Sequence, residues 1–258
     1  MEINLNGIRM HYEHVGTGAA VLLIHAFPLA GAMWQTQLAA LRTHYRVIVP
    51  DLRGFGRTDA PPGPATMDQQ ADDLAALLRH LGIAHATIVG LSMGGYIAFA
   101  LWRRHRELVT ALVLADTRAG ADHAEGRAAR EANARLVEEQ GAAVLADRLI
   151  PNLVASSASE TIRNELRSLI SANSPTGIAA ALRGMAIRPD STPDLPTITV
   201  PTLVLVGEQD TLTPPSEATM IHEGIIGSQL VSIPGVGHMS NLEQPEAFNA
   251  ALLAFLGT

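Results

Sequence analysis

The amino-acid sequence predicts an α/β fold in which helices cover both faces of a mostly parallel sheet. Short β-branched runs alternate along the chain with stretches whose apolar residues recur every three or four positions. The β-branched runs are continuously apolar, which is typical of strands that are buried on both sides. With 258 residues, 47% of them hydrophobic, the chain is long enough to form one large core.

Each predicted element follows from its local pattern. Residues 8–14 alternate between apolar and polar side chains, as an edge strand does, and Asn6-Gly7 predicts the hairpin turn that pairs them with residues 3–5. Continuous apolar runs predict buried strands at residues 21–24, 46–49, 86–89, 111–114 and 202–206, and residues 229–233 predict the last strand. Helical periodicity predicts helices near residues 34–41, 67–81, 93–104, 215–223 and 245–256.

The alternation of strands and helices stops between about residues 118 and 195. This stretch is rich in alanine, arginine and glutamate, and it predicts four amphipathic helices at residues 127–140, 142–150, 159–171 and 175–185. A proline-rich stretch, residues 188–196, then returns the chain to the strand pattern. We therefore expect a core formed by residues 1–117 and 196–258, and an inserted α-helical cap of residues 118–195 that lies over the sheet.

The composition excludes several classes of chemistry. The chain contains no lysine, which excludes a Schiff base and a lysine-bearing phosphate loop, and no cysteine, which excludes a disulfide, a thiolate nucleophile and a zinc–thiolate site. A net charge of −7 argues against nucleic acid. No G-x-G-x-x-G is present, and His11 and His14 alone are weak evidence for a metal. We expect no cofactor, no metal and no membrane span, and a cytoplasmic location.

The segment Gly90-Leu-Ser-Met-Gly94 follows an apolar run and opens a predicted helix. A G-x-S-x-G nucleophile elbow requires this context, because its serine occupies a strained turn and its glycines leave room for neighbouring backbone. Ser92 is therefore the candidate nucleophile. The alternative is an ordinary strand-to-helix turn in which Ser92 caps the helix.

A serine nucleophile needs a base and an acid that orients the base. His238 lies between glycine-rich residues and the last predicted helix, so its loop can bring the imidazole over the sheet edge. Asp210 directly follows the strand at residues 202–206, and the order Ser, Asp, His is the order used by this kind of site. Asp116, which follows the strand at residues 111–114, is the rival acid.

An acyl-transfer site also needs two amide donors for the oxyanion. We expect these from Met93, which follows the nucleophile, and from Phe27 in the loop after residues 21–24, because Pro28 cannot donate. His25 in the same loop is expected to brace it. Asp51 is expected to stabilise the turn at residues 52–56. We expect a solvated helix end formed by Arg103, Arg104 and Arg106. An apolar pocket is expected to be lined by Leu29, Leu212 and Met239.

These segments resemble the α/β-hydrolase superfamily over nearly the whole chain, and within it short-chain bacterial carboxylesterases and 3-oxoadipate enol-lactonases. The segments that carry the resemblance are His25–Pro28, Asp51–Gly56, Gly90–Gly95, Val113–Arg118, Gly184–Ser191, Gly207–Asp210, Gly237–Met239 and Glu243–Glu246. The resemblance implies an eight-stranded sheet, the helical cap, and the roles assigned above to Ser92, Asp210 and His238. Epoxide hydrolases and haloalkane dehalogenases have aspartate at the elbow, so Ser92 argues against those activities.

One residue departs from the family pattern. The superfamily usually has glycine after the loop histidine, whereas this chain has Ala26. A positive φ at Ala26 would cost about 1 kcal/mol of strain; otherwise the loop has a slightly different shape.

The sequence therefore predicts a serine carboxylesterase that cleaves small, short-chain esters through an acyl-enzyme. Enol-lactone hydrolysis, carbon–carbon bond hydrolysis and perhydrolysis use the same three side chains and remain alternatives. The lactonase alternative requires a cationic side chain in the pocket, for which Arg118, Arg148, Arg183 and Arg188 are candidates. An alternative of another class is a ligand receptor built on a hydrolase fold.

Overall fold

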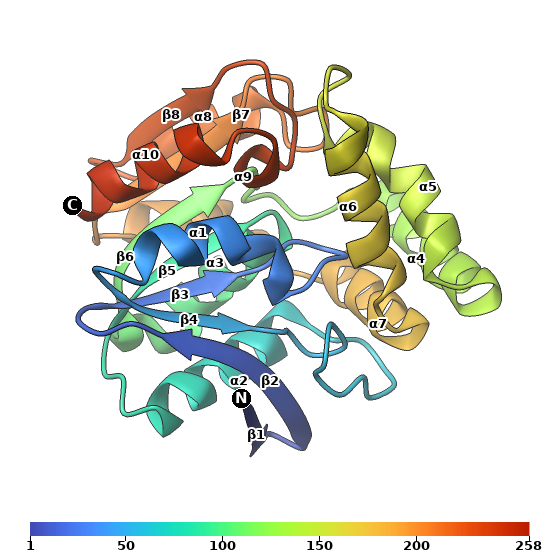
Figure 1. The fold of residues 1–258 in the computed structure, drawn as a ribbon, viewed down its shortest axis with the longest axis horizontal. Coiled ribbons are helices and arrows are strands. Elements are labelled where there is room, and N and C mark those ends of the chain that lie inside the picture. Colours follow the sequence, from blue (N-terminus) through green and yellow to red (C-terminus); the bar gives the residue numbers. More distant parts are fainter. Residues whose placement is uncertain (258) are drawn as a thin grey trace.

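The computed structural model describes residues 1–257, and these contain an eight-stranded sheet of order β1-β2-β4-β3-β5-β6-β7-β8 (Figure 1). β1 and β2 pair antiparallel, as do β2 and β4, and all other neighbours are parallel. The strands are β1 Glu2–Leu5, β2 Ile8–Val15, β3 Ala20–Ile24, β4 Arg46–Pro50, β5 Ala86–Leu91, β6 Val109–Ala115, β7 Thr202–Gly207 and β8 Gln229–Ile233. The sheet and fold class predicted from the sequence are confirmed.

Helices connect the strands. The α-helices are α1 Gln35–Leu41, α2 Met67–His80, α3 Met93–His105, α4 Ala124–Gln140, α5 Ala142–Leu153, α6 Glu160–Ser171, α7 Pro175–Ala186, α8 Pro215–Gly224, α9 Ser240–Glu243 and α10 Pro245–Leu256. Three short 3₁₀ helices are η1 Gly31–Trp34, η2 Arg106–Leu108 and η3 Thr192–Thr197. None of the helices found in residues 1–257 is both long enough and apolar enough to cross a membrane.

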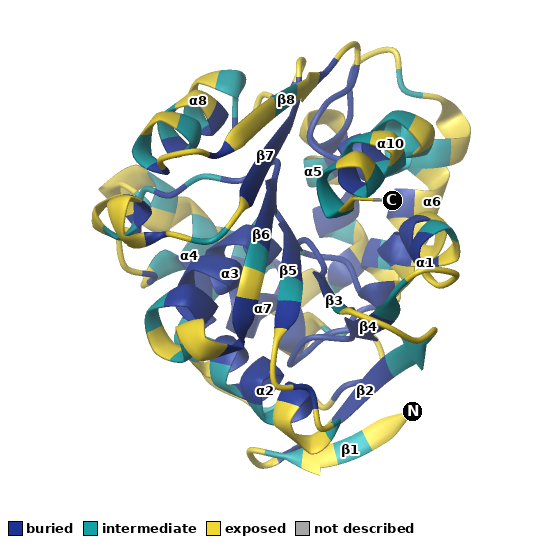
Figure 2. Ribbon diagram, turned by 90° about the vertical axis from the view of Figure 1, so that its left-hand side faces the viewer, coloured by how far each residue is buried: buried dark blue, intermediate teal, exposed yellow. Residues whose placement is uncertain are grey.

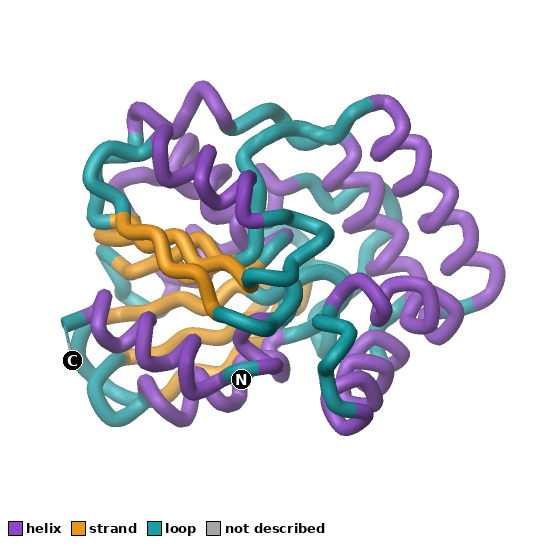
Figure 3. Tube along the Cα trace, turned by 90° about the horizontal axis from the view of Figure 1, so that it is seen from above, coloured by secondary structure: helices purple, strands orange, loops and turns teal. Residues whose placement is uncertain are grey.

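The two faces of the sheet bury separate hydrophobic clusters because side chains alternate along each strand. On one face, Leu22 and Ile88 pack with residues of α2, α3 and α8. On the other face, Leu23 and Val89 pack with residues of α1 and α10. Figure 3 shows helices on both sides of the strands, and Figure 2 shows that the central strands are buried. The central strands are therefore covered on both faces, as their continuous apolar runs predict.

Helices α4 to α7 lie together at one end of the sheet, between β6 and β7 in the chain (Figure 1). We refer to residues 124–186 as the four-helix segment. It contacts loops that follow the carboxyl ends of strands: the amide of Ala65 donates to the carbonyl of Ala180 (3.0 Å), and the amide of Met239 donates to the carbonyl of Leu153 (2.9 Å). Gly177 approaches Gly54 so closely that a Cβ atom on Gly177 would lie 1.8 Å from the Gly54 carbonyl oxygen.

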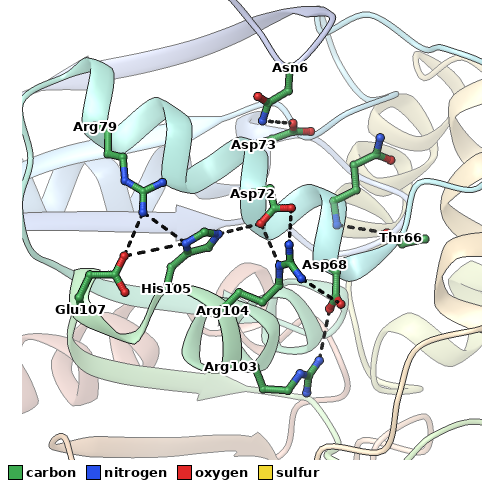
Figure 4. Close-up of polar contacts among 11 residues, drawn as sticks. Asn6, Thr66, Asp68, Asp72, Asp73, Arg79, Arg103, Arg104, His105 and Glu107 are labelled. Atoms are coloured by element: carbon green, nitrogen blue, oxygen red, sulfur yellow. Dashed lines mark hydrogen bonds and ion pairs between the residues drawn. The ribbon is translucent and has the colours of Figure 1, made fainter.

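The contact between α2 and α3 adds to one expectation. The sequence predicts a solvated helix end at Arg103, Arg104 and Arg106. Arg104 and Arg106 are exposed, but Arg103 and Arg104 are also paired with acids of α2 (Figure 4). Arg104 donates to both carboxylate oxygens of Asp72 (2.9 and 2.7 Å), and His105 contacts the same carboxylate. Arg103 binds Asp194 at 2.6 Å. The acids come from distant parts of the sequence, so the pattern within α3 alone could not indicate this network.

Candidate active site

Ser92 occupies a sharp turn between β5 and α3. Its backbone has φ 55° and ψ −111°, a conformation that side-chain-bearing residues rarely adopt. The two flanking glycines are required by packing: a Cβ atom on Gly90 would lie 2.3 Å from the carbonyl oxygen of Gly94, and one on Gly94 would lie 2.2 Å from that of Ile24. Ser92 has no side-chain capping bond to α3, so the alternative of a simple helix cap is not what the geometry shows.

Ser92, His238 and Asp210 form a continuous hydrogen-bonded chain. His238 Nε2 lies 2.8 Å from Ser92 Oγ, and His238 Nδ1 lies 2.7 Å from Asp210 Oδ2. With the Nδ1–H donating to the carboxylate, Nε2 is left to accept the serine proton. The side chains of His238 and Asp210 are almost completely buried, so the pair is shielded from bulk solvent.

Asp210 is held as a carboxylate by several donors. The amides of Leu212 and Thr213 donate to its Oδ1 (2.8 and 2.9 Å), and the Thr213 hydroxyl donates to Oδ2 (2.6 Å). Burial by itself would raise the pKa of Asp210, but His238 and the bonds from His238 and Thr213 outweigh it and lower this pKa. Sequence reasoning missed Thr213, although its position three residues after Asp210 is a signal for such a turn.

Asp116, the rival acid, is used elsewhere. It is fully buried with φ 44°, its Oδ1 accepts from the amide of Gly207 (2.8 Å), and its Oδ2 accepts from the hydroxyl of Ser240. Burial raises the pKa of Asp116 to about 7. The imidazole of His238 therefore has Asp210, and not Asp116, as its carboxylate partner.

The two predicted oxyanion donors belong to residues that follow the carboxyl ends of β3 and β5, which are neighbouring parallel strands. Phe27 and Ser92 both line one cavity, and Met93 is the first residue of α3. Within residues 1–257, neither the Phe27 nor the Met93 amide donates to a protein acceptor. Ala26 is not among the non-glycine residues with positive φ, so it carries no left-handed strain. The loop accommodates alanine at this position.

His25 and Asp51 support the surrounding loops. His25 is buried, its Nδ1 bonds to the carbonyl of Ala26 (2.9 Å), and its Nε2 accepts from the amide of Leu52 (3.0 Å). Burial lowers the pKa of His25 to about 4, so the ring is neutral at physiological pH. Asp51 accepts from the amide of Arg57 (3.0 Å), which closes the turn after β4. Both residues act on the backbone, as the sequence predicts.

A cavity of about 300 Å³ lies between the sheet and the four-helix segment, and Ser92 and His238 form part of its wall. The remaining wall consists of Phe27, Tyr96, Arg118, Asp122, Gly126, Ala129, Arg130, Asn133, Leu145, Leu149, Leu153, Leu182, Met185, Leu212 and Thr213. The sequence predicts Leu212 in this wall. It also predicts Leu29 and Met239 there, but neither side chain lines the cavity and both are completely buried, so these two assignments are corrected.

Only some of the arginines predicted as candidates for the pocket line the cavity. Arg118 lines the cavity, as does Arg130, which sequence reasoning did not single out. Arg183 instead pairs with Glu131 and Glu138, and Arg148 donates to Asn133. No group of three or more histidine, aspartate or glutamate side chains within residues 1–257 is arranged to hold a metal ion.

Comparison with known proteins places the chain in a family. Residues 19–245 match the alpha/beta hydrolase fold family, and the chain belongs to it. A thermophilic esterase from Thermogutta terrifontis, solved with malate bound, is 42% identical, with a TM-score of 0.96 over 99% of this chain and 98% of that one. The enol-lactonase from Burkholderia xenovorans is 30% identical, with a TM-score of 0.93 over 100% of both chains.

A curated relative points in the same direction. The 3-oxoadipate enol-lactonase 2 of Acinetobacter baylyi is 35% identical over 256 residues, which are 96% of this chain and 93% of that protein. The resemblance found in the sequence is therefore confirmed. The chain is a hydrolase of the α/β-hydrolase family, and its relatives include both esterases and lactonases.

Proposed function

We propose that this protein is a serine carboxylesterase that cleaves small, short-chain esters through an acyl-enzyme. The observation that carries the proposal is the Ser92–His238–Asp210 chain, with links of 2.8 and 2.7 Å, at the wall of a cavity. Esterases of similar sequence and structure support it.

In the proposed mechanism, Ser92 Oγ attacks the ester carbonyl while His238 Nε2 accepts the hydroxyl proton. Asp210 holds the imidazole in the required tautomer and stabilises its charged form. The amides of Phe27 and Met93 receive the oxyanion, assisted by the positive end of the α3 dipole. The imidazolium then protonates the departing alcohol. A water molecule, deprotonated by His238, attacks the acyl-enzyme and releases the acid.

Residues 118–195, which include the four-helix segment, are proposed to act as a cap inserted into a core of residues 1–117 and 196–258. Its side chains Leu145, Leu149 and Leu182 form an apolar part of the cavity wall. A cavity of about 300 Å³ is at the lower end of the range for small-molecule sites. We therefore expect short acyl chains to be preferred over long ones.

The test is steady-state hydrolysis of p-nitrophenyl esters from acetate to palmitate. We expect turnover that is highest for short chains and that falls on the order of 10⁶-fold in Ser92→Ala. Ser157→Ala, an exposed serine just beyond α5, is the matched control and should retain full activity. Folded protein without turnover across the series would count against this esterase activity and favour a specialised lactone hydrolase, a carbon–carbon bond hydrolase or a receptor. Undiminished activity in Ser92→Ala would refute the nucleophile.

Lactone hydrolysis is the second candidate, because two enol-lactonases align with nearly the whole chain. The same acyl-transfer steps open a lactone, with the leaving alcohol remaining attached to the acyl group. Carbon–carbon bond hydrolysis shares the three side chains but has no further support from these relatives. Comparing kcat/KM for an enol-lactone with that for an open-chain ester of equal size would rank the two activities.

A further inference from the structure

Arg118 is placed beside the proposed nucleophile by the loop that follows β6. The preceding residue, Thr117, donates its hydroxyl to the carbonyl oxygen of Ser92 (2.8 Å), which fixes this loop against the elbow. The Arg118 side chain lines the same cavity as Ser92 and His238. A bound substrate therefore lies in the cavity that Arg118 faces.

The charge of Arg118 is not balanced by the protein. Its Nη2 donates to the carbonyl oxygen of Leu212, and its buried Nε has no hydrogen-bond partner. In the part of the chain that the structure describes, residues 1–257, no carboxylate lies within ion-pair distance of Arg118. A guanidinium that is partly removed from water without a counter-charge is unfavourable, so a ligand anion would stabilise it.

The neighbouring acid cannot supply this counter-charge. Asp122 is the acidic residue of the cavity wall, and it already pairs with two arginines, Arg130 and Arg188. Arg188 is fixed further by stacking on Tyr96, 4.2 Å from the ring centre. The single negative charge of Asp122 therefore neutralises only one of the two arginines that it pairs with. The positive charge of Arg118 adds to the excess positive charge at this part of the cavity.

We propose that Arg118 binds a free carboxylate on the substrate, so that the preferred substrates are esters or lactones whose acyl part carries a second carboxylate. Half-esters of short dicarboxylic acids are the simplest members of this class. The planar guanidinium suits this ligand, because its N–H groups match the two oxygens of a carboxylate. The inference rests on the proposed function for the reaction itself. Hydrolysis consumes one water molecule; an ester releases an alcohol and a diacid, and a lactone releases one hydroxy-diacid.

The first experiment compares two substrates of nearly equal shape, the monoethyl ester of glutaric acid and the corresponding ester half-amide. The quantity measured is kcat/KM for the half-ester divided by kcat/KM for the half-amide. A general loss of activity lowers both values equally and leaves this ratio unchanged. We expect this ratio to fall roughly 10- to 100-fold in Arg118→Gln, the range for losing a hydrogen-bonded charge, and to fall less in Arg118→Lys. Arg57→Gln removes an exposed arginine outside the cavity and should leave the ratio unchanged.

A second experiment does not depend on turnover. Calorimetry measures glutarate binding to the wild type and to Arg118→Gln, with valerate as the ligand that lacks the second carboxylate. We expect tighter binding of glutarate than of valerate, and loss of that preference in the variant. An unchanged preference, or an unchanged substrate ratio, would overturn the carboxylate site. If the wild type hydrolyses no ester but still binds glutarate through Arg118, the proposed function fails and the binding site stands.

Discussion

At the scale of single residues, two buried aspartates at adjacent strand ends have opposite environments. Asp210 accepts three protein N–H or O–H donors in addition to His238, and its pKa is lowered. Asp116 has two donors and no cationic partner in direct contact, and burial raises its pKa to about 7. The deeper burial of Asp116, together with the His238 contact and the additional donors at Asp210, explains why only Asp210 is suited to orient an imidazole at neutral pH.

This difference predicts the effect of removing each charge on activity. In Asp210→Asn the amide would favour the wrong tautomer of His238, and kcat should fall about 10⁴-fold, as in other serine triads. Asp116→Asn keeps acceptor and donor atoms near Gly207 and Ser240, and we expect a much smaller change. Steady-state kinetics with p-nitrophenyl acetate measures both. A larger loss in Asp116→Asn than in Asp210→Asn would reverse the assignment of the acid.

Asp116 should also make stability depend on pH. Its folded pKa of about 7 lies above the ordinary value of 3.8, so the folded state holds the proton more tightly than the unfolded state. The resulting stabilisation is present at low pH and is lost as pH rises through about 7. Relative to Asp116→Asn, the wild type should lose on the order of a few kcal/mol between about pH 4.5 and about pH 8.

Urea unfolding of both proteins at the two pH values measures this loss. His25 acts in the opposite direction, because its folded pKa of about 4 makes stability fall as pH drops below about 6.5. His25 is present in both proteins, so its contribution cancels in the difference. A difference that does not change with pH would mean that Asp116 titrates normally.

At the scale of elements, one carboxylate joins the loop of His238 to the four-helix segment. Glu243 in α9 accepts from the amide of Gly237 (2.8 Å) and from the amide of Ala155 (2.9 Å), just beyond α5. Gly237 has no room for a side chain, since its Cβ would lie 2.6 Å from the Ala155 nitrogen. The position of the base is therefore tied to the position of α5, whose Leu153 lines the cavity.

Replacing this carboxylate tests the link. In Glu243→Gln one of the two amides would face an NH₂ group, and an unsatisfied buried donor costs about 1–3 kcal/mol. We expect a loss of stability within that range, and a fall in kcat that exceeds the rise in KM because the imidazole is displaced. Urea unfolding and steady-state kinetics measure the two effects. Glu246→Gln, in the first turn of α10 and exposed, is the control that should change neither.

The elements also show what the sequence could and could not predict. The buried strands were predictable because a continuous apolar run bounded by turn residues is typical of a strand covered on both faces. Helix α10 has its predicted bounds because Pro245 marks its start. In the four-helix segment, α4 begins at Ala124, before the predicted start at Arg127, and α5 continues through Pro151 to Leu153. Residues 124–126 are Ala-Glu-Gly and give no apolar signal for the start of α4, and Pro151, a residue that usually ends a helix, placed the predicted end of α5 too early.

From the sequence, site residues could be predicted only where their role depends on a position at the end of a strand. Ser92, His238 and Asp210 lie at such places, and the structure brings their side chains together. The cavity wall depends instead on which face a side chain presents. Leu29 and Met239 follow functional segments closely, yet neither side chain lines the cavity. Arg118 could be named as a candidate but not chosen, because its lack of a partner is a three-dimensional property.

At the scale of the whole molecule, both hydrophobic clusters extend from the sheet into the four-helix segment. The cluster with α2 and α3 includes Val137 of α4 and Ile178 of α7, and the cluster with α1 and α10 includes Ile150 of α5 and Ile170 of α6. Asn173 adds a polar link, donating to the carbonyl of Pro28 (2.9 Å) and accepting from the amide of Gly56 (2.8 Å). The proposed cap is therefore packed as part of the same core.

This continuity predicts a single cooperative unfolding transition, and the placement of the aromatic residues allows a direct test. Both tryptophans, Trp34 and Trp102, are buried outside the four-helix segment, so their fluorescence reports on the core. Far-ultraviolet circular dichroism also reports on α4 to α7. In urea the two signals should change together, and Asn173→Ala should lower both midpoints equally. If the cap unfolded separately, the dichroism would begin to fall at lower urea than the fluorescence, and Asn173→Ala would widen that gap.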